Sequence, residues 1–280
     1  MDGISGALVA LAQRAEHATP VEAGDYERDG ILYCGKCNTP KQTVIEIGGK
    51  KFKPYCLCRC ESEAYQEKET ERKQFELETE IRRLRRAAFS ERMMEDWTFA
   101  NDDLSNEKLT NAMRRYTEKF SEMRVKGKGL LLYGTVGTGK TYAACEVANA
   151  LIDRGIPCLV TNFARLANRI QGLYEDKQDY IDSLSRYDLL VIDDLGAERK
   201  SEFMQEMVFN IIDARYRSGL PMIVTSNLTI EQIKSPENTN YSRIYDRIIE
   251  RCFPVEVSGK SRRRKAVRED YDNMKALLGL

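Results

Sequence analysis

Gly134-Thr135-Val136-Gly137-Thr138-Gly139-Lys140-Thr141 is the stretch that decides the fold class of this chain. It matches the G-x-x-x-x-G-K-[ST] pattern of a phosphate-binding loop. The apolar residues 129–133 before it predict a short buried strand, and residues 142–151 after it predict a helix. In this arrangement backbone N–H groups and the positive end of a helix face a bound phosphate. We therefore expect a nucleotide site, with Lys140 on the β- and γ-phosphates and the Thr141 hydroxyl on Mg²⁺.

The chain from residue 97 onward alternates short apolar segments with amphipathic ones. This alternation is typical of an α/β domain with a parallel sheet. Besides residues 129–133, strands are expected at 157–161, 188–193, 221–226 and 253–257, which gives a five-stranded sheet. Helices are expected at 163–187, 202–218 and 240–251.

Polar residues follow two of these strands. Asp193 and Asp194 come directly after the apolar residues 189–192. Ligands bind at the carboxyl ends of strands in open α/β sheets, so both carboxylates are expected beside the phosphate-binding loop. We expect Asp193 to hold Mg²⁺ through water and Asp194 to polarise the attacking water. Asn227 follows the next strand, where its amide would orient that water or contact the γ-phosphate, although a turn-forming asparagine has the same pattern.

Five of the eight cysteines lie close together near the N-terminus: Cys34, Cys37, Cys56, Cys58 and Cys60. A C-x₂-C pair and a second group 18 residues later have the spacing of a zinc ribbon. The single histidine, His17, is distant in sequence, so we expect a Cys₄ zinc site that leaves out one of the last three cysteines. A disulfide framework and an iron–sulfur cluster are the alternatives. Residues 43–54 between the groups predict a small hairpin.

Composition and charge organise the rest of the chain. Lys+Arg and Asp+Glu are equal at 44 each, so net charge indicates no nucleic-acid partner. Residues 61–95 are highly charged and lack Gly and Pro, which predicts a solvated linker helix. No apolar run is long enough to span a membrane, and the N-terminus does not resemble a signal peptide. We expect a cytoplasmic protein with an N-terminal zinc module at 1–60, a linker at 61–95 and an α/β domain at 96–280.

The phosphate-binding loop, Ile192–Glu198, Thr225–Asn227, Asp246-Arg247 and Ser261-x-Arg263 together resemble the AAA+ ATPases of the bacterial and phage DnaC-like helicase-loader family. The resemblance covers about residues 95–265. It implies an ATPase with a reduced C-terminal lid that loads a replicative ring helicase onto single-stranded DNA as replication begins. The cell would be a bacterium or a phage-infected host.

The resemblance also assigns roles to residues. Asp193 and Asp194 become the Walker B pair, Asn227 sensor 1, and Arg263 sensor 2. Arg247 becomes the arginine finger, acting on a neighbouring subunit of a self-associated ATPase, although Arg243 and Arg251 are close to it. The segment 163–187 is similar to an initiator-type insertion that contacts single-stranded DNA, with candidate contacts Arg165, Arg169 and Lys177. The zinc module would bind the helicase.

Three other functions remain open at this point. An IstB-like transposition helper ATPase shares the ATPase motifs, but a cysteine module is not expected in it. A small-molecule kinase shares the phosphate-binding loop but does not need the later motifs. The third is a zinc-containing DNA-binding regulator whose nucleotide site is only structural. Its rate of ATP turnover would not change when DNA or helicase is added.

Overall fold

The chain forms two compact units in the computed structural model, Met1–Glu78 and Thr79–Leu280. The boundary falls within helix α2 (Arg59–Ala88). The structure describes residues 11, 14–15, 19–173, 176–198, 201–235, 239–259, 261, 271, 274–275 and 277–278. The sequence also predicts a short helix over residues 7–18, and most of these residues fall outside this described part.

The first unit is built from two short antiparallel hairpins. Strands β1 (Tyr26–Arg28) and β2 (Ile31–Tyr33) form one, and β3 (Ile45–Ile47) and β4 (Lys50–Phe52) form the other. The second confirms the hairpin expected at 43–54. Among the described residues of this unit, the buried apolar side chains are those of Cys34, Phe52 and Cys58. So small a core needs additional stabilisation, such as a structural metal or disulfides.

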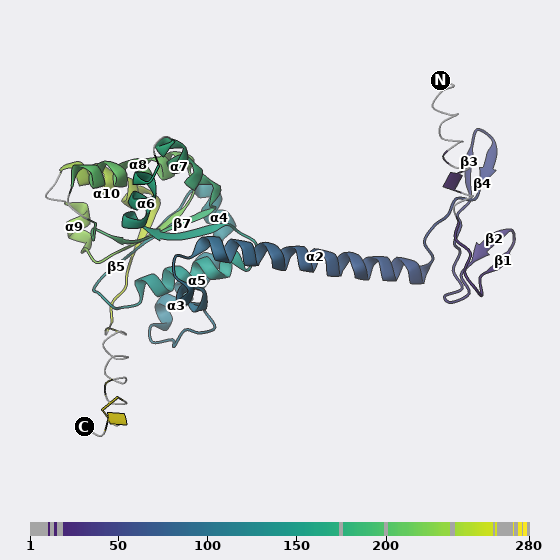
Figure 1. The fold of residues 1–280 in the computed structure, drawn as a ribbon, viewed down its shortest axis with the longest axis horizontal. Helices are drawn as coiled ribbons and strands as arrows, with labels where there is room; N and C mark the ends of the chain where they lie inside the picture. Colours follow the sequence, from purple (N-terminus) through teal and green to yellow (C-terminus); the bar gives the residue numbers. More distant parts are fainter. Residues whose placement is uncertain are drawn as a thin grey trace. The chain divides into compact units, whose positions relative to one another are not determined.

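The second unit contains a parallel sheet flanked by helices (Figure 1). The sheet has five strands in the order β6-β7-β8-β5-β9. This confirms the predicted α/β fold. The strands are β5 (Gly129–Tyr133), β6 (Cys158–Asn162), β7 (Leu189–Leu195), β8 (Met222–Ser226) and β9 (Cys252–Glu256). The order places the phosphate-loop strand β5 next to β8, with β7 on the far side of β8.

Helices cover both faces of this sheet. Side chains alternate between the faces along each strand, and because the strands are apolar on both faces, each face needs a layer of helices to bury it. Leu130, Leu132 and Val191 point to one hydrophobic core, and Leu131 and Ile192 point to the other. The first core includes α3 (Glu107–Glu118), α5 (Lys140–Ile152) and the end of α2. The second includes α6 (Phe163–Gln171), α8 (Glu202–Ser218) and α10 (Thr239–Arg251). The sheet is therefore the middle of three layers.

Shorter helices complete the unit: η1 (Arg92–Asp96), α4 (Phe120–Lys126), α7 (Lys177–Ser183), η2 (Leu184–Arg186) and α9 (Ile230–Lys234). The last turns of α2 pack Leu84 and Ala88 into the first core, so this part of the charged helix is not merely solvated. In the described part of the chain, no helix has the length and apolarity that crossing a membrane requires.

Candidate nucleotide and metal sites

The predicted phosphate-binding loop joins β5 to α5. Gly137 and Gly139 have φ of +83° and +97°, the left-handed region that glycine adopts without strain. Lys140 is the first residue of α5, and its ammonium donates to the carbonyls of Gly134 and Thr135 at 2.8 Å each. A Cβ on Gly137 would lie 2.3 Å from the hydroxyl of Ser261, so the segment after β9 returns to the loop. Backbone N–H groups at the start of a helix fit a polyphosphate here.

Asp193 reaches the loop from the carboxyl end of β7. Its Oδ1 accepts hydrogen bonds from the hydroxyls of Thr141, at 2.8 Å, and Thr225, at 2.6 Å. Burial raises the pKa of Asp193 above its ordinary value, while these two hydrogen bonds act in the opposite direction. A carboxylate next to a threonine hydroxyl is a donor set of the hard oxygen type that Mg²⁺ prefers. The two residues predicted to hold Mg²⁺ thus lie together.

Asp194 and Asn227 lie at the same edge of the sheet. The side-chain amide of Asn227 donates to Asp194 Oδ1 at 3.3 Å. Both residues are exposed, whereas Asp193 is partly buried. An exposed carboxylate beside an amide and close to the loop suits a group that contacts water. The structure therefore brings together the loop, the acidic pair and the asparagine, which the sequence places more than 90 residues apart in total.

The described contacts of Arg247 are with residues of α8 rather than with the phosphate-binding loop, Asp193, Asp194 or Asn227. Its guanidinium pairs with Asp213 of α8 at 2.7 Å and lies 4.7 Å from the ring centre of Phe209. Arg251 stacks over Tyr216 at 4.7 Å, one turn further along α10, while Arg243 is exposed one turn earlier. Arg263 and the rest of its basic run lie outside the described residues, so the predicted sensor 2 stays a prediction.

The candidate DNA contacts in segment 163–187 are partly engaged within the chain. Arg165 of α6 pairs with Glu91 at 3.1 Å. The guanidinium of Arg169 lies 5.8 Å from the ring centre of Tyr180, and Lys177 is exposed at the start of α7. These contacts do not bring the three cations into one cluster.

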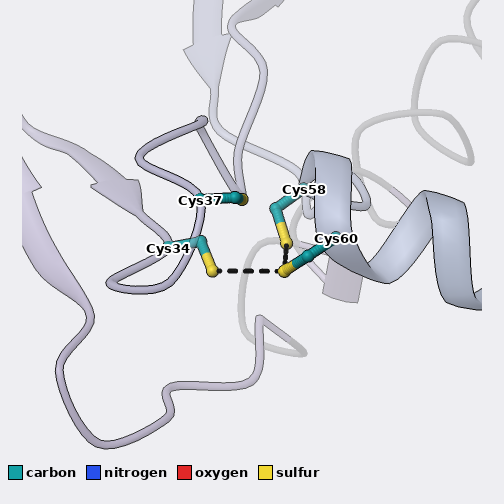
Figure 2. A group of neighbouring side chains, drawn as sticks. All are labelled: Cys34, Cys37, Cys58 and Cys60. Atoms are coloured by element: carbon teal, nitrogen blue, oxygen red, sulfur yellow. Dashed lines mark hydrogen bonds between the residues drawn. The ribbon is translucent and has the colours of Figure 1, made fainter.

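Four of the five N-terminal cysteines converge (Figure 2). The sulfur atoms of Cys34, Cys37, Cys58 and Cys60 all lie within 4.8 Å of one another. Four sulfurs around one zinc ion at 2.3 Å would be about 3.8 Å apart, so the group fits a tetrahedral metal. The fifth, Cys56, instead points its thiol at the carbonyl of Pro40, 3.8 Å away. Cys56 therefore lies outside the group of four, which makes Cys34, Cys37, Cys58 and Cys60 the candidate metal ligands.

The clustered thiols differ in pKa: that of Cys37 is lowered, whereas burial raises that of Cys58. All described cysteines are free thiols. A hydrogen bond with the Thr39 hydroxyl is the largest of the causes that lower the pKa of Cys37 to about 5, which favours the thiolate that a metal binds. Zinc fits this donor set as a structural ion, because four protein ligands leave no open position for substrate.

A buried lysine supports both cysteine turns. Lys41, only 1% exposed, contacts Asp25 at 2.9 Å and Glu61 at 3.5 Å. Asp25 accepts from the N–H of Gly35 in the first turn, and Glu61 accepts from the N–H of Cys58 in the second. Sequence analysis missed this lysine, because its neighbours in the chain resemble those of an ordinary surface residue.

Comparison with known proteins agrees with this geometry. A family model described as IstB-like ATP binding protein matches residues 63–270. The replicative helicase loader DnaI of Bacillus subtilis (strain 168) is 24% identical over 185 residues, 59% of this chain and 58% of the relative. The replicative helicase loader DnaC of Buchnera aphidicola subsp. Schizaphis graminum (strain Sg) is 29% identical over 146 residues, 50% of this chain and 57% of the relative. The chain thus spans little more than half the length of the curated relatives it matches.

A comparison with solved structures also finds a similarity to DnaI. The crystal structure of the DnaI aligns with a TM-score of 0.52 and 28% identity, over 64% of this chain and 99% of the other. The predicted resemblance to helicase loaders and the predicted ATP-binding character are both confirmed by these matches. Because the family match covers most of the chain, this protein belongs to the IstB-like ATP binding protein family.

Proposed function

We propose that this chain is an ATPase that loads a replicative ring helicase onto single-stranded DNA at the start of DNA replication. The observation that carries the proposal is the meeting of the phosphate-binding loop with Asp193 through Thr141, at 2.8 Å, in a chain similar to replicative helicase loaders. A phosphate-binding loop alone would serve many functions. The acidic pair and Asn227 at the adjoining strand ends favour nucleotide hydrolysis among these functions.

The loop residues 134–141 would cradle the phosphates of ATP, with Lys140 on the β- and γ-phosphates. Thr141 and Asp193 would hold Mg²⁺, which supplies charge neutralisation of the phosphates when bound. Asp194 would orient and polarise the attacking water, and the amide of Asn227 would fix the orientation of that carboxylate. This division explains why Asp193 is shielded and Asp194 is exposed.

Arg247 would act on the nucleotide of a neighbouring subunit. Its contacts with Asp213 and Phe209 hold the guanidinium on the surface formed by α8 and α10, at 27% exposure. An arginine oriented in this way is available to a second copy of the chain. Arg263 would complete the site as sensor 2. Self-association through the ATPase unit is part of this proposal.

The cysteine cluster would bind one zinc ion through Cys34, Cys37, Cys58 and Cys60. The metal would stabilise a small unit whose apolar core is limited. We propose that this unit contacts the helicase, since the family match begins at residue 63 and so leaves the cysteine cluster outside the matched region. Contacts with single-stranded DNA are assigned to Arg165, Arg169 and Lys177.

Transposition is the competing function, because the family takes its description from IstB-like proteins. The relatives named as helicase loaders and the cysteine cluster favour the loader. Affinity capture with the full chain separates the two. We expect the wild-type protein and Lys140→Ala to retain a purified replicative helicase, and Cys58→Ser to lose it. Capture of a transposase but not of the helicase would contradict the loader function.

A further inference from the structure

The acidic pair sits on an irregularity of the sheet. Strands β7 and β8 pair as Ile192 with Val224, and the next pair is Leu195 with Ser226. Between these pairs β7 has two residues, Asp193 and Asp194, where β8 has the single residue Thr225. Such a bulge breaks the hydrogen-bond ladder and re-aims the side chains that it carries. Asp194 accordingly has φ of +57°, a conformation that few residues other than glycine adopt.

At the bulge, the hydroxyl of Thr225 accepts the hydrogen bond of a β7 backbone N–H in place of a carbonyl of β8. Thr225 is completely buried. The N–H of Asp194 donates to Thr225 Oγ1 at 2.9 Å, and this hydroxyl donates in turn to Asp193 Oδ1 at 2.6 Å. A hydroxyl has a single proton, so the direction of the chain from Asp194 through Thr225 to Asp193 is fixed. One side chain thus holds both the backbone of one acid and the carboxylate of the other.

Neighbouring contacts make this arrangement rigid. Asp193 Oδ1 also accepts from Thr141 of the phosphate-binding loop, at 2.8 Å. On the other side of the bulge, the Ser226 hydroxyl donates to the carbonyl of Leu195 at 2.7 Å. The left-handed backbone of Asp194 is therefore held between two strand hydroxyls. Without the Thr225 hydroxyl, the N–H of Asp194 and the Oδ1 of Asp193 would each lose a hydrogen-bond partner.

We propose that Thr225 is a positioning residue for ATP hydrolysis, which sets the orientation of both Asp193 and Asp194 through its one hydroxyl. The inference rests on the proposed nucleotide function. Thr225 makes its hydrogen bonds to the acidic pair and not to the loop. Its loss should therefore affect turnover and the Mg²⁺ requirement far more than the binding of ATP.

The test compares Thr225→Val, which keeps the side-chain volume, with Thr225→Ser, which keeps the hydroxyl. Thr161→Val is the matched control, because Thr161 is a buried threonine on β6 that pairs with Ile192 from the other side of β7. We expect kcat to fall about 10- to 100-fold in Thr225→Val and the Mg²⁺ concentration for half-maximal rate to rise about tenfold, as for other partners of metal ligands. ATP affinity should change less than about twofold, and Thr225→Ser should recover most of the rate.

Equal kcat in Thr225→Val and Thr161→Val, with normal ATPase activity of the wild type, would overturn the inference and leave the proposed function standing. A wild type that hydrolyses ATP but loads no helicase would overturn the loader function and leave the comparison of threonine variants valid. Should Thr225→Val fail to fold, Thr225→Ser and Thr225→Cys replace it, because a thiol is a weak donor of about the same size. Equal rates in those two would also refute the role of the hydroxyl.

Discussion

Replacing Arg215 by methionine tests how the strands that carry the nucleotide site are held. Arg215 lies in the last turn of α8, is 3% exposed, and donates to backbone carbonyls at the starts of β7 and β8. Its acceptors are Leu184 at 3.4 Å, Tyr187 at 2.8 Å, Asp188 at 2.9 Å, and Pro221 at 3.2 Å and 2.5 Å. The guanidinium therefore joins α8, η2, β7 and β8 at the edge opposite to the acidic pair.

The cost of the substitution follows from these acceptors. The carbonyls of Leu184 and Pro221 also accept hydrogen bonds from backbone N–H groups. Among the described residues, the carbonyls of Tyr187 and Asp188 accept from the Arg215 guanidinium alone, so these two would lose their donor. These two carbonyls are partly buried, and losing the donor costs about 1–3 kcal/mol for each, so Arg215→Met should destabilise the unit by about 4 kcal/mol. For a unit of this size that corresponds to a fall of about 10 °C in Tm.

Urea unfolding followed by tryptophan fluorescence measures the free energy of unfolding of the second unit, Thr79–Leu280. Trp97 is the single tryptophan of the chain and stacks on Tyr142 of α5, at 5.6 Å between ring centres. Arg217→Met is the matched control, because Arg217 lies on the same helix but is 65% exposed and pairs with Asp213 at the surface. We expect it to change stability by less than about 1 kcal/mol. Equal destabilisation by the two variants would refute the reasoning from buried carbonyls.

Three further predictions concern the sites themselves. Lys140→Ala should abolish ATP binding in a calorimetric titration while circular dichroism stays unchanged, and Asp194→Asn should bind ATP and lose turnover; equal loss of binding in both would make Asp194 structural. Metal analysis should find one zinc per chain in the wild type and in Cys56→Ser but not in Cys58→Ser, and iron with visible absorbance, or no metal, would contradict the zinc site. Arg247→Ala should bind ATP normally and hydrolyse it about 10³-fold more slowly, and mixing it with Lys140→Ala should restore activity. A mixture without recovery at any ratio would place the action of Arg247 within its own chain.

The order of elements in the ATPase unit was predictable because its signals are local. The strand ahead of the loop was predicted at residues 129–133, where β5 lies, and the helix predicted at 202–218 coincides with α8. The apolar run ending in two aspartates placed them correctly at a strand end. The hairpin of β1 and β2 was missed, although Asp29-Gly30 between two short strands is a turn signal, and both residues have positive φ.

The remaining features depend on contacts that spacing does not encode. Nothing in a C-x-C-x-C run shows which thiol lies outside the cluster, and it is the fold that places Cys56 against Pro40 while the other four sulfurs converge. Lys41 and Arg215 look like surface cations in the sequence, yet each is buried by partners distant in the chain. The role of Thr225 arises from a bulge that shifts the register by one residue, so that Ile192 and Leu195 lie in the same core although they are three positions apart. Because β7 is buried on both faces, its run of apolar residues does not reveal this shift.

Helicase loading on circular single-stranded DNA tests the central proposal most directly. The full chain would be mixed with ATP, Mg²⁺ and the purified replicative helicase, and the helicase retained on the DNA after gel filtration would be measured. We expect retention to depend on this chain and on ATP, and to fall to the level without loader in Cys58→Ser, which loses the zinc site. Helicase retention that is the same with and without the wild-type chain would contradict the account.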